Sequence, residues 1–152
     1  MAIFYREVKV KRTVLFLVLM SVLGITQALT DNRYHLGFND EEKVEFLSEM
    51  RQMLSSIQQI TLGIGTGNKA MIIKAARYSG NRMARATSQS IKDKTPISFE
   101  KIGGPTHMMF ETLAINAAEV DADDADDMKD LAELTGKLMR HCLACHEAFT
   151  VN

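Results

Sequence analysis

The chain has 152 residues, a formal charge of −1 and 46% hydrophobic residues, with only two prolines. This composition predicts a single globular domain that is long enough to bury a core around a cofactor. Residues 29–152 carry 14 basic against 18 acidic side chains, a balance that gives no support for nucleic-acid binding.

The first 28 residues have the pattern of a secretory signal peptide. A positive segment comes first, formed by Arg6, Lys9, Lys11 and Arg12. An apolar run from Val14 to Ile25 follows, and Thr26-Gln27-Ala28 offers a cleavage site. The run is short for a membrane span, which needs about 20 residues, so an uncleaved anchor is only the alternative. We therefore expect export to the periplasm, removal of residues 1–28, and no membrane span in the mature chain.

The first helix of the domain is predicted over about 39–62. Asn39 is a suitable N-cap, three acids follow it, and Glu42 occupies the capping-box position. Apolar residues then recur every three or four positions, which indicates one buried stripe. Three glycines between positions 63 and 67 are expected to end this helix.

The middle of the chain predicts two further helices and one long connection. A second helix is expected over about 68–88, with Gly80 as a point where it weakens or bends. Residues 89–105 are expected to form the connection, which ends in the breaker sequence Gly103-Gly104-Pro105. A third helix is predicted over about 106–120.

A fourth helix is predicted over about 123–149, and the acidic residues at 121–127 form the turn that leads into it. Its apolar residues keep one face through to the end of the chain, and its acids stand at the end that the helix dipole favours. No stretch alternates with a period of two for long enough to be a strand. Four helices with mostly short links predict an all-α fold, an up-down-up-down four-helix bundle whose core is suited to a cofactor.

The motif Cys142-Leu143-Ala144-Cys145-His146 has the C-x-x-C-H spacing that attaches a c-type haem covalently. Two thiols must reach the two vinyl groups of a porphyrin, and the following imidazole must ligate the iron. On a helix, Cys142, Cys145 and His146 fall within an arc of roughly 100° and project toward one surface. The sequence therefore predicts a C-terminal covalent haem site with one haem c per chain. Cys142 and Cys145 would form the thioethers, and His146 would be the proximal iron ligand.

Three other interpretations of the cysteine pair are weaker. A thioredoxin-like dithiol lies where a strand leads into a helix N-terminus, whereas this pair lies near the end of a helical pattern. A zinc site needs a second pair of ligands, which the sequence does not offer at a suitable spacing. A disulfide between residues three apart on a helix would stabilise nothing. The signal peptide also agrees with haem attachment, which takes place after export.

Residues 39–152 resemble a class II cytochrome c, a family that combines a four-helix bundle with a C-x-x-C-H motif close to the C-terminus. The segment from Cys142 to Phe149 is similar to the family's C-x-A-C-H-x-x-[FY] ending. Thr150 departs from the pattern, because a basic residue often stands there.

Within this resemblance, Met50-Arg51-Gln52-Met53 is similar to the M-[KR]-x-M segment of the low-spin branch, whose members supply a methionine as second axial ligand. The resemblance implies that Met50 is the distal iron ligand, with Met53 as second choice, and that Arg51 lies beside the cofactor. Spacing alone would not single out Met50, because methionine is a common core residue.

The other histidines are weaker candidates for ligands. His35 precedes the first helix and is expected at the surface, although it is near enough to swing in. His107 is expected to cap a helix or to face solvent. His141 lies about 90° from the cysteine face, so we expect it to be partly exposed and at best near a propionate.

Ligation by methionine and histidine fills both axial positions and raises the reduction potential. Because such an iron offers no place for a substrate, the resemblance implies a periplasmic carrier of single electrons and not an enzyme. The alternative is a high-spin cytochrome c′ that binds nitric oxide or carbon monoxide at an open distal site. A haem peroxidase ranks lower, since only Arg51 is placed to assist one.

Redox proteins are the expected partners. Helix 68–88 carries five basic residues and no acid, while residues 121–133 carry seven acids, a polarity that would steer a charged partner. Two solvated faces of opposite sign are the simpler explanation. Class II members are often homodimers through their first two helices, so the resemblance also implies a homodimer.

Overall fold

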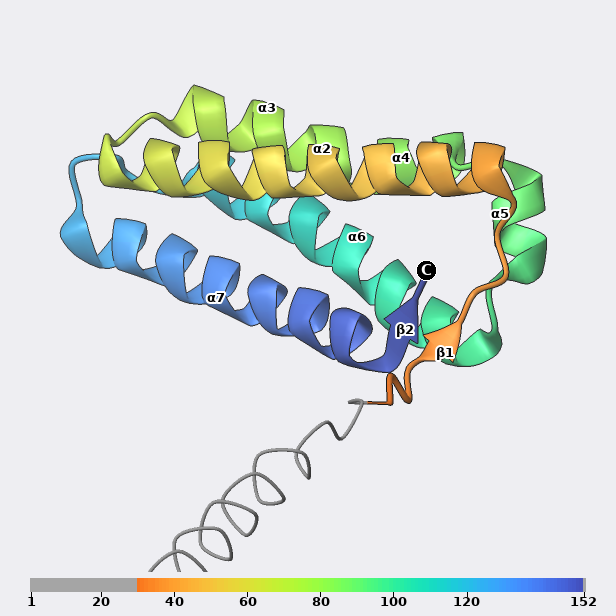
Figure 1. The fold of residues 1–152 in the computed structure, drawn as a ribbon. Helices are drawn as coiled ribbons and strands as arrows, with labels where there is room; N and C mark the ends of the chain where they lie inside the picture. Colours follow the sequence, from red (N-terminus) through yellow and green to blue (C-terminus); the bar gives the residue numbers. More distant parts are fainter. Residues whose placement is uncertain (1–29, 152) are drawn as a thin grey trace, which may run out of the picture. The chain divides into compact units, whose positions relative to one another are not determined.

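A computed structural model describes residues 30–151, in which four long helical segments pack against one another (Figure 1). Residues 1–28, the predicted signal peptide, lie outside the described part. The helices are α2 (Asp40–Gly65), α3 (Lys69–Ser79), α4 (Asn81–Ala86), α5 (Gln89–Lys94), α6 (Ile97–Glu119) and α7 (Ala125–Ala148). The chain reverses direction from α2 to α3 and α4, again to α6, and again to α7, and the predicted all-α fold with four main helices is confirmed. Within residues 30–151, no helix is both long and apolar enough to cross a membrane.

One cluster of buried side chains, which we call the main core, joins α2, α3, α6 and α7. Its members are Ile60, Ile72, Ala75, Ala76, Phe110, Leu113, Ala114, Ala117, Leu131 and Leu138. The four members in α6 recur at three-and-four spacing, so one stripe of that helix faces the other three. Full burial of a Leu, Ile or Phe side chain stabilises a fold by about 1.5–3 kcal/mol, and five of the ten are such residues with no exposed surface.

A second cluster, which we call the end cluster, closes the end of the bundle where α2 begins and α7 ends. Its buried members are Leu36, Phe38, Phe46, Ile91 and Phe149. Phe99 connects the rings, because its centroid lies 5.9 Å from that of Phe46 and 5.3 Å from that of Phe149. Tilted and edge-to-face pairs of this kind contribute about 0.5–1.5 kcal/mol each beyond the area that they bury.

The chain termini of this unit meet in two short strands that the sequence did not predict. β1 (Tyr34–His35) pairs in parallel with β2 (Phe149–Thr150), in the register Tyr34 to Phe149. The fourth helix therefore ends at Ala148, and Phe149 turns into the end cluster instead of extending the helix. Strands of two residues are too short to show a period of two, which explains why the pattern missed them.

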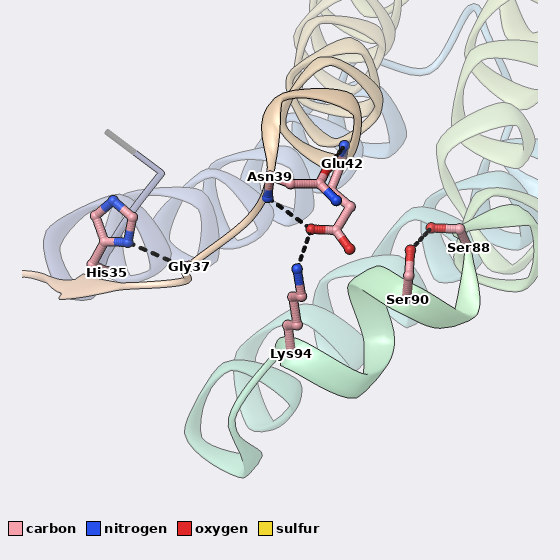
Figure 2. Close-up of polar contacts among 7 residues, drawn as sticks. All are labelled: His35, Gly37, Asn39, Glu42, Ser88, Ser90 and Lys94. Atoms are coloured by element: carbon pink, nitrogen blue, oxygen red, sulfur yellow. Dashed lines mark hydrogen bonds and ion pairs between the residues drawn. The ribbon is translucent and has the colours of Figure 1, made fainter.

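The start of α2 has the predicted capping box. The amide of Glu42 donates to Asn39 Oδ1 at 2.9 Å, and the amide of Asn39 donates to Glu42 Oε2 at 2.8 Å (Figure 2). Lys94 at the end of α5 reaches the same Oε2 atom at 2.5 Å. The side chain of Glu42 therefore joins the start of α2 to α5.

The end of α2 differs from the prediction, because the helix continues through Gly63 to Gly65. A Cβ atom at Gly63 would lie 2.6 Å from a side-chain carbon of Ile72, so this glycine allows α3 to approach closely. Gly67, at a φ of +66°, ends the helix in a Schellman motif, in which the amide of Asn68 donates to the carbonyl of Gly63 at 2.8 Å.

The second predicted helix is broken at Gly80 into α3 and α4, and α6 supplies groups that bind the broken ends. His107 Nδ1 lies 2.7 Å from the carbonyl oxygen of Ser79, and the amide of Asn81 donates to Glu111 Oε1 at 2.9 Å. A Cβ atom at Gly80 would lie only 2.4 Å from the same carboxylate oxygen. A larger residue at position 80 would force the Glu111 side chain to move and give up its hydrogen bond from Asn81.

The predicted long connection over 89–105 is wrong. It contains α5 and the first turns of α6, and Gly103-Gly104-Pro105 lies inside α6 instead of ending a loop. A proline inside a helix costs about 3 kcal/mol, because it removes one hydrogen bond and crowds the preceding turn. Burial outweighs this cost here, since Phe99 and Ile102 pack against the end cluster and Thr106 is buried.

Candidate cofactor site

A pocket of about 630 Å³ opens between α2, α6 and α7, beside the end cluster. Met50, Arg51 and Met53 line it from α2. Cys142, Cys145 and His146 line it from α7. The fold thus brings to one pocket two motifs that lie about ninety residues apart in the sequence. Its volume falls in the range of roughly 300–1,000 Å³ that is typical of small-molecule and cofactor sites.

The C-x-x-C-H motif occupies the last two turns of α7, and its backbone is held by the neighbouring chain termini. The amide of Phe149 donates to the carbonyl of Cys145, and Arg33 Nη1 donates to the carbonyl of His146 at 3.3 Å. These contacts satisfy carbonyl groups that a helix end leaves without partners. They fix the motif while Cys142 and Cys145 are half-buried in the pocket wall and His146 is exposed.

The two thiols are free and poorly ionised. Burial raises the pKa of Cys142, and burial together with the neighbouring Cys142 raises the pKa of Cys145 to about 11. The motif also lies at the C-terminal end of α7, where the helix dipole disfavours an anion. A thioredoxin-like pair needs the opposite, a thiolate that is stabilised at a helix N-terminus.

The two methionines of α2 pack in different surroundings. Met50 packs against the end cluster, as does Cys145, whereas Met53 packs against the main core. Both side chains are partly buried, and Arg51 between them is exposed. Met50 and the cysteine motif therefore share one packing environment, and Met53 lies one turn further along α2.

The histidines fall into three different places. His35 is exposed in β1, does not line the pocket, and accepts a hydrogen bond from the amide of Gly37 at 3.0 Å (Figure 2). His141 is partly exposed, as expected, and lies in the pocket wall. For His107, the expected capping role is found, at the end of α3, but the alternative of a solvent-facing side chain is wrong. His107 is half-buried in the third turn of α6, lines the pocket, and contacts the Ser79 carbonyl.

Several pocket residues carried no signal in the sequence. Phe99, Gly103 and Gly104 line the pocket from the segment that was predicted to be a loop. Glu49 also lines it, and burial raises the pKa of this carboxyl although the Thr87 hydroxyl donates to it at 2.9 Å. Knowing that α6 begins at Ile97 would have placed Phe99 and Gly103, since positions 99, 103 and 107 lie on one helix face.

No family model, no curated protein and no solved structure matches this chain. The chemistry of the site is therefore inferred from its own residues.

Proposed function

We propose that the protein is an exported c-type cytochrome that carries single electrons, related to the class II cytochromes c of the low-spin branch. One observation carries the proposal. A single pocket has Cys142, Cys145 and His146 on one wall and Met50 on another. These are the groups that covalent haem attachment and two axial bonds require.

The residues of the pocket fit a haem in size and in chemistry. Apolar and aromatic side chains such as Phe46, Ile57 and Phe99 form much of its wall, which suits a flat, largely apolar macrocycle. Arg51, Lys92 and His141 also line it, and their side chains suit the carboxylates of such a group.

Each residue has a distinct task in this proposal. Cys142 and Cys145 would tether the group, and His146 would ligate the iron from the end of a helix that Arg33 and Phe149 hold in place. Met50 would supply the second axial bond from α2. The bound group would supply one-electron redox chemistry at the iron. If Met50 and His146 both held the iron, no position would be left for a substrate, and the protein would not be an enzyme.

The test is to produce the full chain in a host that matures c-type cytochromes, and to purify it from the exported fraction. The intact mass should equal that of the signal-cleaved chain plus one haem, and the visible spectrum should be low-spin in both oxidation states. A Cys142→Ser/Cys145→Ser variant from the same host serves as the control and should carry no covalent haem.

Two outcomes would count against the proposal in different ways. Unmodified thiols or an S–S bond in the exported protein would remove the cytochrome function altogether. A haem-bearing protein with a high-spin spectrum that binds carbon monoxide or nitric oxide readily would instead favour a gas-binding cytochrome c′.

A further inference from the structure

A second hollow, of about 460 Å³, lies between α6 and α7, and its polar residues are basic. Lys101 lines it from α6, and Lys137, Arg140 and His141 line it from α7. The remaining wall residues are apolar, and none is acidic. We call this feature the basic hollow.

The basic hollow lies behind the C-x-x-C-H motif. At 100° per residue, Arg140 and Ala144 are each about 160° from Cys142 around α7, so they face away from the cofactor pocket. His141 belongs to the walls of both the hollow and the pocket. The hollow and the cysteines are therefore separated by about one helix thickness, roughly 10 Å.

The cations of the hollow form no ion pair among the described residues, although Glu133 lies one turn before Lys137 on α7. Acids gather between 119 and 133, where eight of them surround a single lysine. The middle of that stretch lies about 20 Å from Arg140 along α7, at 1.5 Å per residue. Most of these acids therefore lie more than one Debye length, about 10 Å at 0.1 M salt, from Arg140, and the lining of the hollow itself is positive.

Three of the five basic residues on α3 and α4 are less available, whereas Lys74 and Arg85 form no ion pair among the described residues. Arg77 lies 3.7 Å from a carboxylate oxygen of Glu111, and the Arg82 guanidinium lies 5.4 Å from the centre of the Tyr78 ring. Lys69 donates to the carbonyl of Val120. These cations already have partners within the molecule, in contrast to those of the basic hollow.

We propose that the basic hollow is the docking surface for an acidic protein that exchanges electrons with the cofactor. This inference rests on the proposed function and names the chemistry of the partner. Carboxylates of the partner would pair with Lys101, Lys137 and Arg140, and one electron would pass at each encounter without any bond being formed or broken. Electron-transfer complexes have small interfaces and depend on charge complementarity, which a surface with a few unpaired cations provides.

The test uses the purified exported protein and a short polyglutamate peptide as the acidic probe. Amide chemical shifts are followed by NMR at low ionic strength and at about 0.1 M salt. The peptide should perturb residues around the basic hollow, and Lys101→Glu/Lys137→Glu should weaken its binding at least about tenfold. The matched control, Lys74→Glu/Arg85→Glu on α3 and α4, makes the same change in charge and should leave binding unchanged.

A second measurement links docking to electron exchange. Oxidation of the reduced protein by the anionic reagent hexacyanoferrate(III) should slow in Lys101→Glu/Lys137→Glu and not in the control. The proposal is overturned if the peptide binds at α3 and α4, or if inorganic phosphate fills the hollow as tightly as the peptide. It is also overturned if the rate of oxidation is unchanged. The mass and spectrum of the same sample test the proposed function separately, because the titration requires no iron.

Discussion

At the scale of single residues, the two methionines of α2 allow a sharp test of the distal ligand. We expect Met50→Ala to convert a low-spin spectrum into a high-spin one, because Met50 shares its packing environment with Cys145. The reduction potential should fall by a measurable part of the roughly 0.8 V range that axial ligands control. Visible spectroscopy and a redox titration of the purified variant are the measurements.

Met53→Ala is the matched control for this substitution, since both side chains line the pocket from the same helix. Because Met53 packs against the main core, its truncation should cost about 2 kcal/mol of unfolding free energy and leave the low-spin spectrum in place. If the two variants exchanged these effects, Met53 would be the ligand and the assignment of Met50 would be wrong.

The thiols give a second prediction, for protein made without haem attachment. Since the pKa of Cys145 is about 11, only about one molecule in a thousand carries a thiolate there at pH 8, and alkylation by iodoacetamide should be slow. The folded pKa lies above the ordinary value of 9.0, so the associated stability is present below pH 9 and is lost as the pH rises toward 11.

The measurement is the alkylation rate of Cys145 against pH, followed by mass spectrometry, with the same chain in urea as the control. Unfolding should restore an ordinary thiol reactivity. Rapid alkylation of the folded protein at pH 7 would indicate a stabilised thiolate and would revive the redox dithiol interpretation.

At the scale of helices, the capping box of α2 predicts a pH dependence of stability. The hydrogen bond from Lys94, and then the one from the amide of Asn39, lower the pKa of Glu42 below its ordinary value of 4.5. The sign follows from linkage. This contribution is fully present above pH 4.5 and is lost as the pH falls through the lower folded pKa. Urea unfolding of Glu42→Gln should therefore depend less on pH in the acid range than unfolding of the natural chain. Glu41→Gln, an exposed change in the same turn, should keep the natural dependence.

Helix boundaries show where local sequence signals suffice and where packing overrides them. Asn39 and Glu42 form a cap from residues three apart, so the start of α2 was predictable from the sequence. Gly63 and Pro105 are local breaker signals that tertiary contacts outweigh, through the close approach of α3 and the packing of Phe99 against the end cluster. No residue near either position announces these contacts, because the partners lie in other elements.

The site divides in the same way. The two cysteines and the histidine of the C-terminal motif lie within five positions, so the pattern alone predicted that they share a surface. The same pocket is also lined by Met50, which lies on another helix. This proximity arises only when α2 packs against α7, so local sequence spacing could not predict it. His107 and Gly104 were missed because their place in the pocket depends on a helix that begins at Ile97.

At the scale of the whole molecule, the two clusters predict two levels of stability in protein that lacks an attached cofactor. The main core has ten buried members from four helices, whereas the end cluster has five and borders the pocket. Without a bound group, the apolar pocket wall beside the end cluster faces solvent and loses packing contacts. The end of the bundle near Phe46 and Phe149 should then open more readily than the region around Ile72 and Phe110.

Hydrogen exchange of the Cys142→Ser/Cys145→Ser variant tests this difference. Amides near Phe46 and Cys145 should exchange at least about tenfold faster than those near Ile72 and Phe110, a gap of about 1.4 kcal/mol in opening free energy. In the haem-bearing protein this difference in exchange rate should be smaller. A group held by both α2 and α7 would oppose the separation of these helices and so stabilise the end of the bundle. Uniform exchange across both clusters in the variant would show that the bundle opens as one cooperative unit. The pocket would then be formed by the fold alone, without help from the cofactor.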